Sequence, residues 1–145
     1  MKYCKFIILL LFCALLMNFQ CDNDDVRQTD SCDGPVLVDN STYQMSESSF
    51  YIVITAIIED DCLNVNISSS GCDGSTWELA LIDSEDIVES MAPQRYLKLI
   101  LVNNEGCLAV FNKEQLFDLS ELRIDGVNQV ILNIEDFPEA LRYSY

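Results

Sequence analysis

The carboxylate side chains are the groups in this sequence that could serve in catalysis or in metal binding. The chain of 145 residues contains 24 Asp and Glu but no histidine. That absence excludes Ser-His-Asp and Cys-His catalysis, histidine-ligated metals and the usual proton shuttle at neutral pH. Two acidic clusters, Glu59-Asp60-Asp61 and Asp83-Glu85-Asp86, could supply the facing carboxylates of a glycosidase. Because acidic turns are usually solvated and so small a domain has little room for a deep cleft, the sequence favours a non-enzymatic protein.

The same carboxylates could bind calcium, which takes six to eight oxygen ligands and often binds weakly at extracellular sites. The segment Asp22-Asn23-Asp24-Asp25 lacks the glycine and the closing glutamate of an EF-hand loop. We therefore expect no cofactor and no dedicated metal site, with weak Ca²⁺ binding as the remaining possibility.

Aromatic side chains could form a platform for a glycan. Trp77, Tyr51 and Tyr96 are the candidates for such a ligand face. Trp77, however, shares its strand parity with Leu79 and Leu81, which favours a place in the core. Exposed, coplanar rings would indicate glycan binding, whereas a buried Trp77 and a flat apolar face would indicate a protein partner.

The charge balance narrows the choice of partners. Eight Lys and Arg against 24 Asp and Glu give a formal net charge of −16. Nucleic-acid binding depends on basic side chains that neutralise phosphates, so this sequence argues against it.

The first twenty residues have the pattern of a secretory signal. Lys2 and Lys5 precede the apolar run Phe6–Met17. That run is shorter than the roughly twenty apolar residues that span a bilayer, so a signal peptide is favoured over a retained membrane anchor. Cys21 follows directly after this segment.

This pattern resembles the precursors of bacterial lipoproteins, in which cleavage precedes a cysteine that then carries the lipid. The loose box before Cys21, with Asn18 and Gln20, is similar to those of Bacteroidota lipoproteins. In that group an acidic stretch after the cysteine resembles a surface-export signal. The residues that fit it are Asp22, Asp24 and Asp25. The resemblance implies lipidation of Cys21 and a place in the outer membrane, at the cell surface, with a periplasmic location as the alternative; acyl chains anchor a protein stably.

The rest of the chain also looks like small uncharacterised lipoproteins of Bacteroidota. The stretches that carry this likeness are Asp61–Leu63, Ser70–Glu78, Gln94–Leu97, Gly106–Phe111 and Tyr143–Tyr145. The likeness implies no activity. We expect a signal peptide over residues 1–20, an acidic tether over 21–31 and one domain over 32–145, long enough for a single core.

Four cysteines of the expected domain, Cys32, Cys62, Cys72 and Cys107, indicate disulfides, because an even number in an exported chain usually does. The absence of any C-x₂-C pair disfavours zinc. If successive strands run up and down, Cys72 and Cys107 fall at the same end of the domain. Cys62 falls at the other end and leaves Cys32 as its partner. The predicted bonds are therefore Cys72–Cys107 and Cys32–Cys62.

Alternation of apolar and polar residues predicts an all-β fold. We expect seven to nine short strands in an antiparallel, immunoglobulin-like β-sandwich, with a small β-barrel as the alternative. Tyr51–Ile58 is apolar on both faces, which predicts a central strand. Asp83–Gln94 is predicted to be a long loop. Asn103–Gly106 is predicted to be a hairpin turn that pairs Tyr96–Val102 with Cys107–Phe111.

Taken together, the sequence predicts a non-enzymatic, lipid-anchored domain of the cell surface or envelope. Its expected role is to bind a partner protein or to support an envelope complex. The alternative is a small glycan- or calcium-binding module that serves nutrient capture.

Overall fold

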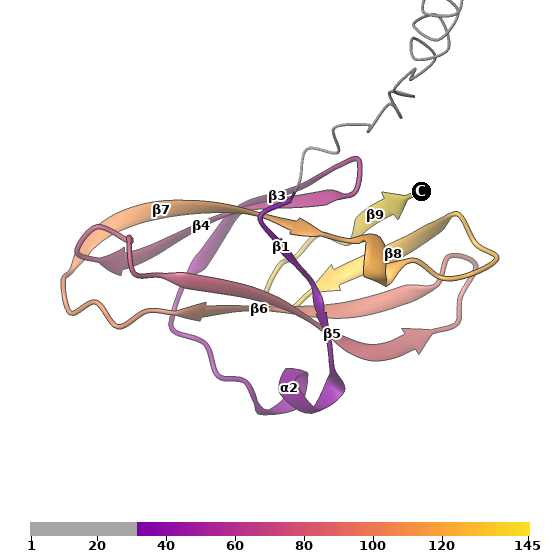
Figure 1. Ribbon diagram of the computed structural model, residues 1–145, viewed down its shortest axis with the longest axis horizontal. Helices are drawn as coiled ribbons and strands as arrows, with labels where there is room; N and C mark the ends of the chain where they lie inside the picture. Colours follow the sequence, from indigo (N-terminus) through magenta and orange to yellow (C-terminus); the bar gives the residue numbers. More distant parts are fainter. Residues whose placement is uncertain (1–31) are drawn as a thin grey trace, which may run out of the picture. The chain divides into compact units, whose positions relative to one another are not determined.

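The computed structural model describes residues 32–145, which form two β-sheets packed against each other (Figure 1). Sheet A has the strand order β1-β7-β4-β3, and sheet B has the order β2-β5-β6-β8-β9. The strands are β1 (Gly34–Pro35), β2 (Leu37–Val38), β3 (Ile52–Glu59), β4 (Cys62–Gly71), β5 (Glu78–Val88), β6 (Gln94–Val102), β7 (Ala109–Asp118), β8 (Gln129–Ile134) and β9 (Leu141–Ser144). This arrangement confirms the predicted all-β sandwich, and within residues 32–145 neither sheet closes into a barrel.

Both sheets are mixed rather than purely antiparallel. The pairs β3–β4, β4–β7, β5–β6 and β8–β9 run antiparallel. The pairs β1–β7, β2–β5 and β6–β8 run parallel. The short β1 and β2 follow each other along the chain yet join different sheets, so the segment after Cys32 links the two layers at one side.

The core lies between the sheets, and the period-two pattern of the sequence fills it. Leu63, Val65 and Ile67 of β4 point inward, and the residues between them point outward. The same alternation places Leu97, Leu99 and Leu101 of β6 in the core. The largest fully buried side chains include Tyr143, Phe117, Leu81, Leu119, Leu122 and Leu132. Alternation predicted these buried faces because successive strand residues point to opposite sides of a sheet.

The β3 strand is at the edge of sheet A, and the prediction that Tyr51–Ile58 is a central strand is wrong. Its apolar residues do occupy both faces. One set packs toward the core: Val53, Ala56 and Ile58. The other set stays exposed on the outer face: Ile52, Ile54 and Ile57. An apolar pattern on both faces of a strand shows that neither face is polar. It does not show whether further strands pair with both edges of that strand.

Two other local predictions are corrected. The expected loop Asp83–Gln94 is largely strand, because β5 continues to Val88 through an irregular register between Asp83 and Ile87. Asn103–Gly106 is not a hairpin turn. It connects β6 in sheet B to β7 in sheet A, where β7 pairs with β4. The bond between Cys72 and Cys107 holds the start of β7 beside the end of β4, which favours that pairing.

Part of the outer face of sheet B is covered, although Tyr96 and Val102 stay exposed there. Figure 1 shows the short helix α2 (Asn40–Met45) on the side of β5 and β6 that faces away from β4 and β7. Beneath this segment, Ile82 and Ile100 on the outer face are buried. Lys98 Nζ donates to the carbonyl of Tyr43 at 2.9 Å and holds the cover in place. In the part of the chain that the structure describes, no helix is long and apolar enough to span a membrane.

Candidate functional site

The outer face of sheet A is the most unusual surface of the domain. Cross-strand neighbours from β3, β4 and β7 form rows on it, set by the register of the three strands. These rows are Ile57–Asn64–Leu116, Thr55–Asn66–Glu114 and Ile52–Ser68–Asn112. Ile52, Ile54 and Ile57 are 58, 47 and 53% exposed. We call this surface the A face; it combines exposed aliphatic side chains with amides, hydroxyls and the carboxylate of Glu114.

The charged residues of the A face are all acidic, in keeping with the net charge of −16 of the whole chain. On the outer side of β3, β4 and β7, alternation places three carboxylates: Glu59, Glu114 and Asp118. Glu114 accepts a hydrogen bond from Asn66 Nδ2 at 2.8 Å. Glu59 and Asp118 flank Cys62 at the end of the sheet that contains the β3–β4 turn. Between Ile52 and Ile58 the edge strand has no charged residue.

The edge of β3 has few of the features that normally prevent strand pairing. Natural sheets protect their edges with short strands, prolines, charges or bulges. The outermost strands β1 and β2 have two residues each and β9 has four. Because β1 and β2 pair with only two residues each, most of β7 and most of β5 also lie at a sheet edge. The β3 strand has eight residues, and its one protective feature is a bulge between Val53 and Thr55. From Thr55 to Glu59 its register with β4 is regular.

The predicted aromatic ligand face does not form. Trp77 is 2% exposed and belongs to the core. Gly71 is packed against the indole, and a Cβ at that position would lie 2.8 Å from a ring carbon. Tyr51 is partly buried and donates from its hydroxyl to the carbonyl of Leu99 at 2.7 Å; burial raises the pKa of Tyr51 to about 12. Tyr96 is 38% exposed. A coplanar platform of Trp77, Tyr51 and Tyr96 is therefore excluded.

The Asp83 carboxylate is part of a buried ion pair. Arg95 Nε donates to Asp83 Oδ2 at 2.9 Å, and Nη2 donates to Oδ1 at 2.8 Å. The side chains of Arg95 and Asp83 are 7 and 0% exposed. The Glu85 N–H also donates to Asp83 Oδ1 at 2.8 Å. With both oxygens occupied and no access to solvent, Asp83 holds β5 and β6 together and does not face a cleft.

Asp61, from the other predicted acidic cluster, accepts two hydrogen bonds through Oδ1. Tyr143 donates from its hydroxyl at 2.6 Å, and Arg123 donates from Nη2 at 2.5 Å. These bonds lower the pKa of Asp61, the bond from Tyr143 most strongly. Burial and the bond to Asp61 raise the pKa of Tyr143 to about 12.

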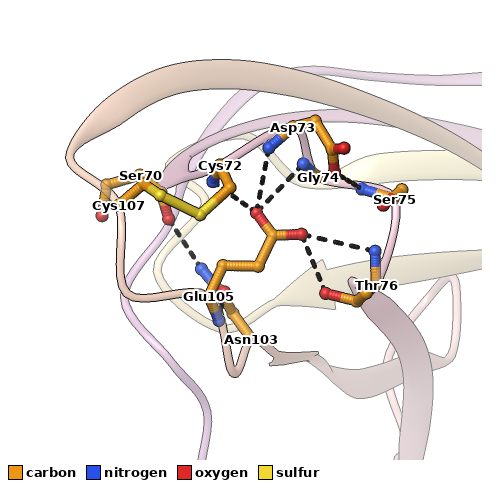
Figure 2. Close-up of a disulfide and its surroundings, with 9 residues drawn as sticks. All are labelled: Ser70, Cys72, Asp73, Gly74, Ser75, Thr76, Asn103, Glu105 and Cys107. Atoms are coloured by element: carbon orange, nitrogen blue, oxygen red, sulfur yellow. Dashed lines mark hydrogen bonds between the residues drawn. A yellow bond between two sulfur atoms is a disulfide. The ribbon is translucent and has the colours of Figure 1, made fainter.

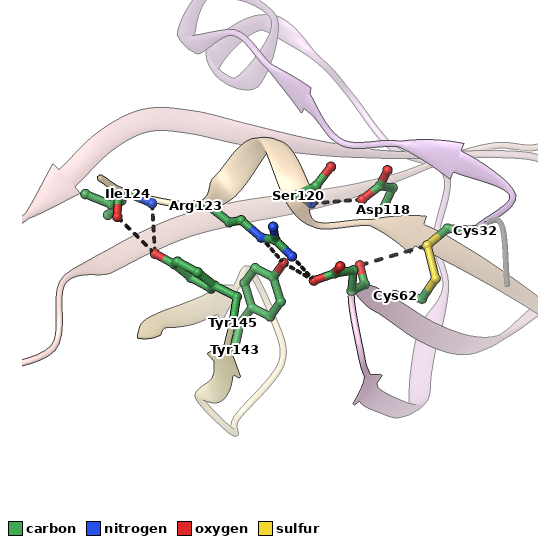
Figure 3. A network of polar contacts seen from close by, with 9 residues as sticks. Cys32, Cys62, Asp118, Ser120, Arg123, Ile124, Tyr143 and Tyr145 are labelled. Carbon is green, nitrogen blue, oxygen red and sulfur yellow. Dashed lines mark hydrogen bonds and ion pairs between the residues drawn. A yellow bond between two sulfur atoms is a disulfide. The ribbon is translucent and has the colours of Figure 1, made fainter. Parts of the chain in front are cut away.

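Figure 3 shows the Arg123 side chain beside the rings of Tyr143 and Tyr145, on the same side of the domain as the disulfide of Cys32 and Cys62. The Arg123 guanidinium lies over the Tyr145 ring at 5.3 Å. The network therefore joins β9 and the segment after β7 to the β3–β4 turn. No local pattern in the sequence marks it, because its members are up to 82 positions apart.

Glu105 occupies a cradle of N–H groups in the loop after β4 (Figure 2). Its Oε2 accepts from the backbone N–H groups of Cys72, Asp73 and Gly74 at 2.5, 3.2 and 3.1 Å. Its Oε1 accepts from the Thr76 hydroxyl at 2.8 Å. Desolvation raises the pKa of Glu105, but the bonds from Thr76 and from the backbone outweigh it and lower the pKa to about 2. No pattern in the sequence predicts this cradle, because Glu105 and Cys72 are 33 positions apart.

The two disulfides join Cys32 to Cys62 and Cys72 to Cys107. These are the pairs that the order of strands predicted. The second bond lies beside the Glu105 cradle, so the loop between β4 and β5 is tied to the β6–β7 connection both covalently and by hydrogen bonds (Figure 2).

Several predictions from the sequence are not addressed by this geometry. Within residues 32–145, no group of three or more His, Cys, Asp or Glu side chains is placed to hold a metal ion. Weak Ca²⁺ binding stays a prediction. Lipidation at Cys21 and the export signal lie outside the described residues, as do the signal peptide and the tether. The export residues concerned are Asp22, Asp24 and Asp25.

Comparison with known proteins supports the fold. No family model matches the chain, and no curated protein matches it by sequence. A protein of unknown function, DUF1344, from Bacteroides vulgatus has a TM-score of 0.52 at 17% identity, over 77% of this chain and 56% of that one. A NigD-like immunity protein from Bacteroides caccae has a TM-score of 0.56 at 9% identity, over 78% and 59%.

A putative toxin-related protein from Parabacteroides distasonis has a TM-score of 0.49 at 14% identity, over 76 and 61% of the two chains. The chain spans less than two thirds of each of these solved proteins. At such identities the likeness extends to the fold alone.

Proposed function

We propose that this chain is a non-enzymatic, lipid-anchored domain of the bacterial envelope that binds a partner protein through the A face. The observation that carries the proposal is the set of exposed isoleucines, Ile52, Ile54 and Ile57, on the outer side of β3. Contiguous exposed apolar surface marks interaction sites in soluble domains.

The contrast between the two sheets supports this proposal. Sheet B buries its outer Ile82 and Ile100 beneath the α2 segment of the same chain. The isoleucines of β3 have no comparable cover within residues 32–145. The buried Trp77 removes the main support for a glycan platform, and the occupied carboxylates of Asp83 and Asp61 give no support to an enzyme.

Site-specific photo-crosslinking in cells tests the proposed face. A photoreactive residue at Ile57 should give a discrete protein adduct. The matched control is Ile87 in β5, which is 45% exposed on a strand of the other sheet. An adduct at Ile57 and none at Ile87 supports binding through the A face. Equal adducts at both positions, or none at either, would overturn it.

The anchor has a separate test, because it depends on Cys21 alone. The intact mass of the protein extracted from membranes should correspond to a chain that starts at Cys21 and carries two or three acyl chains. A mass without lipid would instead indicate a secreted or periplasmic protein. Changing Cys21 to Ser should release the protein from the membrane fraction, while the two disulfides should still form.

A further inference from the structure

We infer that the partner of the A face is a basic protein surface. Its Lys and Arg side chains pair with Glu59, Glu114 and Asp118, and its apolar side chains cover Ile52 and Ile57. This inference rests on the proposed function and gives the chemistry of the partner. Acidic and apolar side chains follow each other along the strands of this face, and every charge among them is negative.

The order of side chains along β7 shows what a complementary partner needs. Asp118, Leu116 and Glu114 take successive positions on the A face, and Ile57 of β3 lies in the same row as Leu116. Asp118 and Glu114 are four residues apart, which is about 13 Å along a strand. A single cation cannot contact both carboxylates. The partner therefore needs two basic side chains with an apolar one between them.

The domain itself does not neutralise these carboxylates. Within residues 32–145, every Lys and Arg contacts a group other than Glu59, Glu114 and Asp118. These contacts are Arg95 with Asp83, Lys98 with Glu135, Lys113 with the carbonyl of Trp77, Arg123 with Asp61, and Arg142 with Gln129. Glu59 and Glu114 are exposed, so a basic side chain that approaches the A face meets carboxylates that have no cation from the described chain.

Glu114 is the carboxylate best placed to receive such a side chain. Its Oε1 accepts a hydrogen bond from Asn66 Nδ2 at 2.8 Å, which orients the carboxylate on the sheet. Asp118, by comparison, is partly buried and accepts from the Ser120 N–H through Oδ1 at 2.9 Å. A hydrogen bond from Lys or Arg to a carboxylate is roughly twice as strong as one between neutral groups. The neighbouring Leu116 would help a bound partner to exclude water from this contact.

Charge also separates a basic partner from the other possible occupants. The net charge of −16 attracts basic proteins and repels acidic ones and anionic lipid headgroups. A purely apolar partner would remove carboxylates from water without a counter-charge, which is costly. Basic side chains offset that cost, while aliphatic side chains bury the exposed isoleucines.

Charge changes at Glu114 and Glu78 give a matched test. Both are exposed strand carboxylates, Glu114 in β7 on the A face and Glu78 at the start of β5 in sheet B. A photoreactive residue at Ile57 of the full-length chain is combined with Glu114→Lys, Glu114→Gln or Glu78→Lys. Glu114→Gln removes the charge but keeps an acceptor for Asn66. Crosslinking is carried out in cells, and in isolated membranes at about 50 and about 500 mM salt; thermal melts check that each variant is folded.

We expect the yield of the Ile57 adduct to follow the charge at Glu114. Glu114→Lys should lower it at least about tenfold, because like charges would then face each other. Glu114→Gln should lower it less, and Glu78→Lys should leave it nearly unchanged. Higher salt should reduce the yield more for the unchanged chain than for Glu114→Gln, because it screens the ion pairs. The crosslinked segment of the partner should contain more Lys and Arg than Asp and Glu.

The other outcomes separate this inference from the proposed function. A protein adduct at Ile57 whose yield responds neither to Glu114→Lys nor to salt would overturn the basic partner and leave binding through the A face standing. An adduct with a second copy of the chain, or with an acidic segment, would do the same. An adduct with lipid alone, or no adduct at Ile57, would overturn both.

Discussion

The buried pair of Asp83 and Arg95 allows a quantitative test of the structural role given to Asp83. Changing Arg95 to Met keeps much of the side-chain volume and removes both donors, at 2.9 and 2.8 Å. Asp83, whose side chain is fully buried, then keeps the Glu85 N–H as a partner. Removing one partner of a buried ion pair costs about 3–5 kcal/mol, because the remaining charge is uncompensated. That is a large share of the roughly 5–15 kcal/mol that stabilises a typical domain.

Urea denaturation followed by tryptophan fluorescence measures this cost, because Trp77 lies in the core. The midpoint should fall at an unchanged m-value. Arg142→Met is the matched control, since Arg142 is exposed and donates to Gln129 at 2.7 Å; its effect should stay within about 0.5 kcal/mol.

A double variant completes the test of this pair. Arg95→Met combined with Asp83→Leu removes both charges and should cost less than Arg95→Met alone, because no unpaired charge remains. A loss below about 1 kcal/mol for Arg95→Met would refute the reasoning. So would a double variant that is less stable than the single one, since the penalty would then not come from the isolated carboxylate.

Three further predictions concern the other contacts. Replacing Cys72 and Cys107 with Ala should lower the free energy of unfolding by about 4 kcal/mol, from the chain entropy of their 35-residue separation; reductant should lower the melting temperature of this variant less than that of the unchanged protein, because only the bond between Cys32 and Cys62 remains to be reduced. Glu105, with its pKa lowered to about 2, stabilises the fold above its usual pKa of 4.5, and this stability is lost as pH falls toward 2. Glu105→Gln should therefore lower the melting temperature at pH 7 and flatten its acid dependence, whereas an unchanged acid profile would contradict the cradle. Tyr51 and Tyr143 have pKa values raised to about 12, so they stabilise the fold below pH 10 and lose this contribution as pH rises from 10 to 12. Tyr51→Phe or Tyr143→Phe should therefore reduce the fall in melting temperature at alkaline pH, measured in a pH series of thermal melts.

Several features of the domain were predictable because they depend on local sequence. Alternation in β4 predicted the buried face of Leu63, Val65 and Ile67, since side-chain direction in a strand is set by position alone. The parity of Trp77 with Leu79 and Leu81 predicted its burial for the same reason. The direction of successive strands was enough to pair the cysteines, because it fixes which end of the sandwich each one occupies.

Which strands pair with each other could be seen only in the tertiary structure. The sequence of Tyr51–Ile58 is as compatible with a central strand as with an edge strand. It does not say whether a further strand pairs with its second edge. Asn103–Gly106 has the composition of a hairpin turn, yet it carries the chain from one sheet to the other. The contacts of Asp61 and Glu105 join residues far apart in sequence. The sequence by itself thus determined the strand faces and the cysteine pairs, while packing decided which apolar side chains stayed exposed.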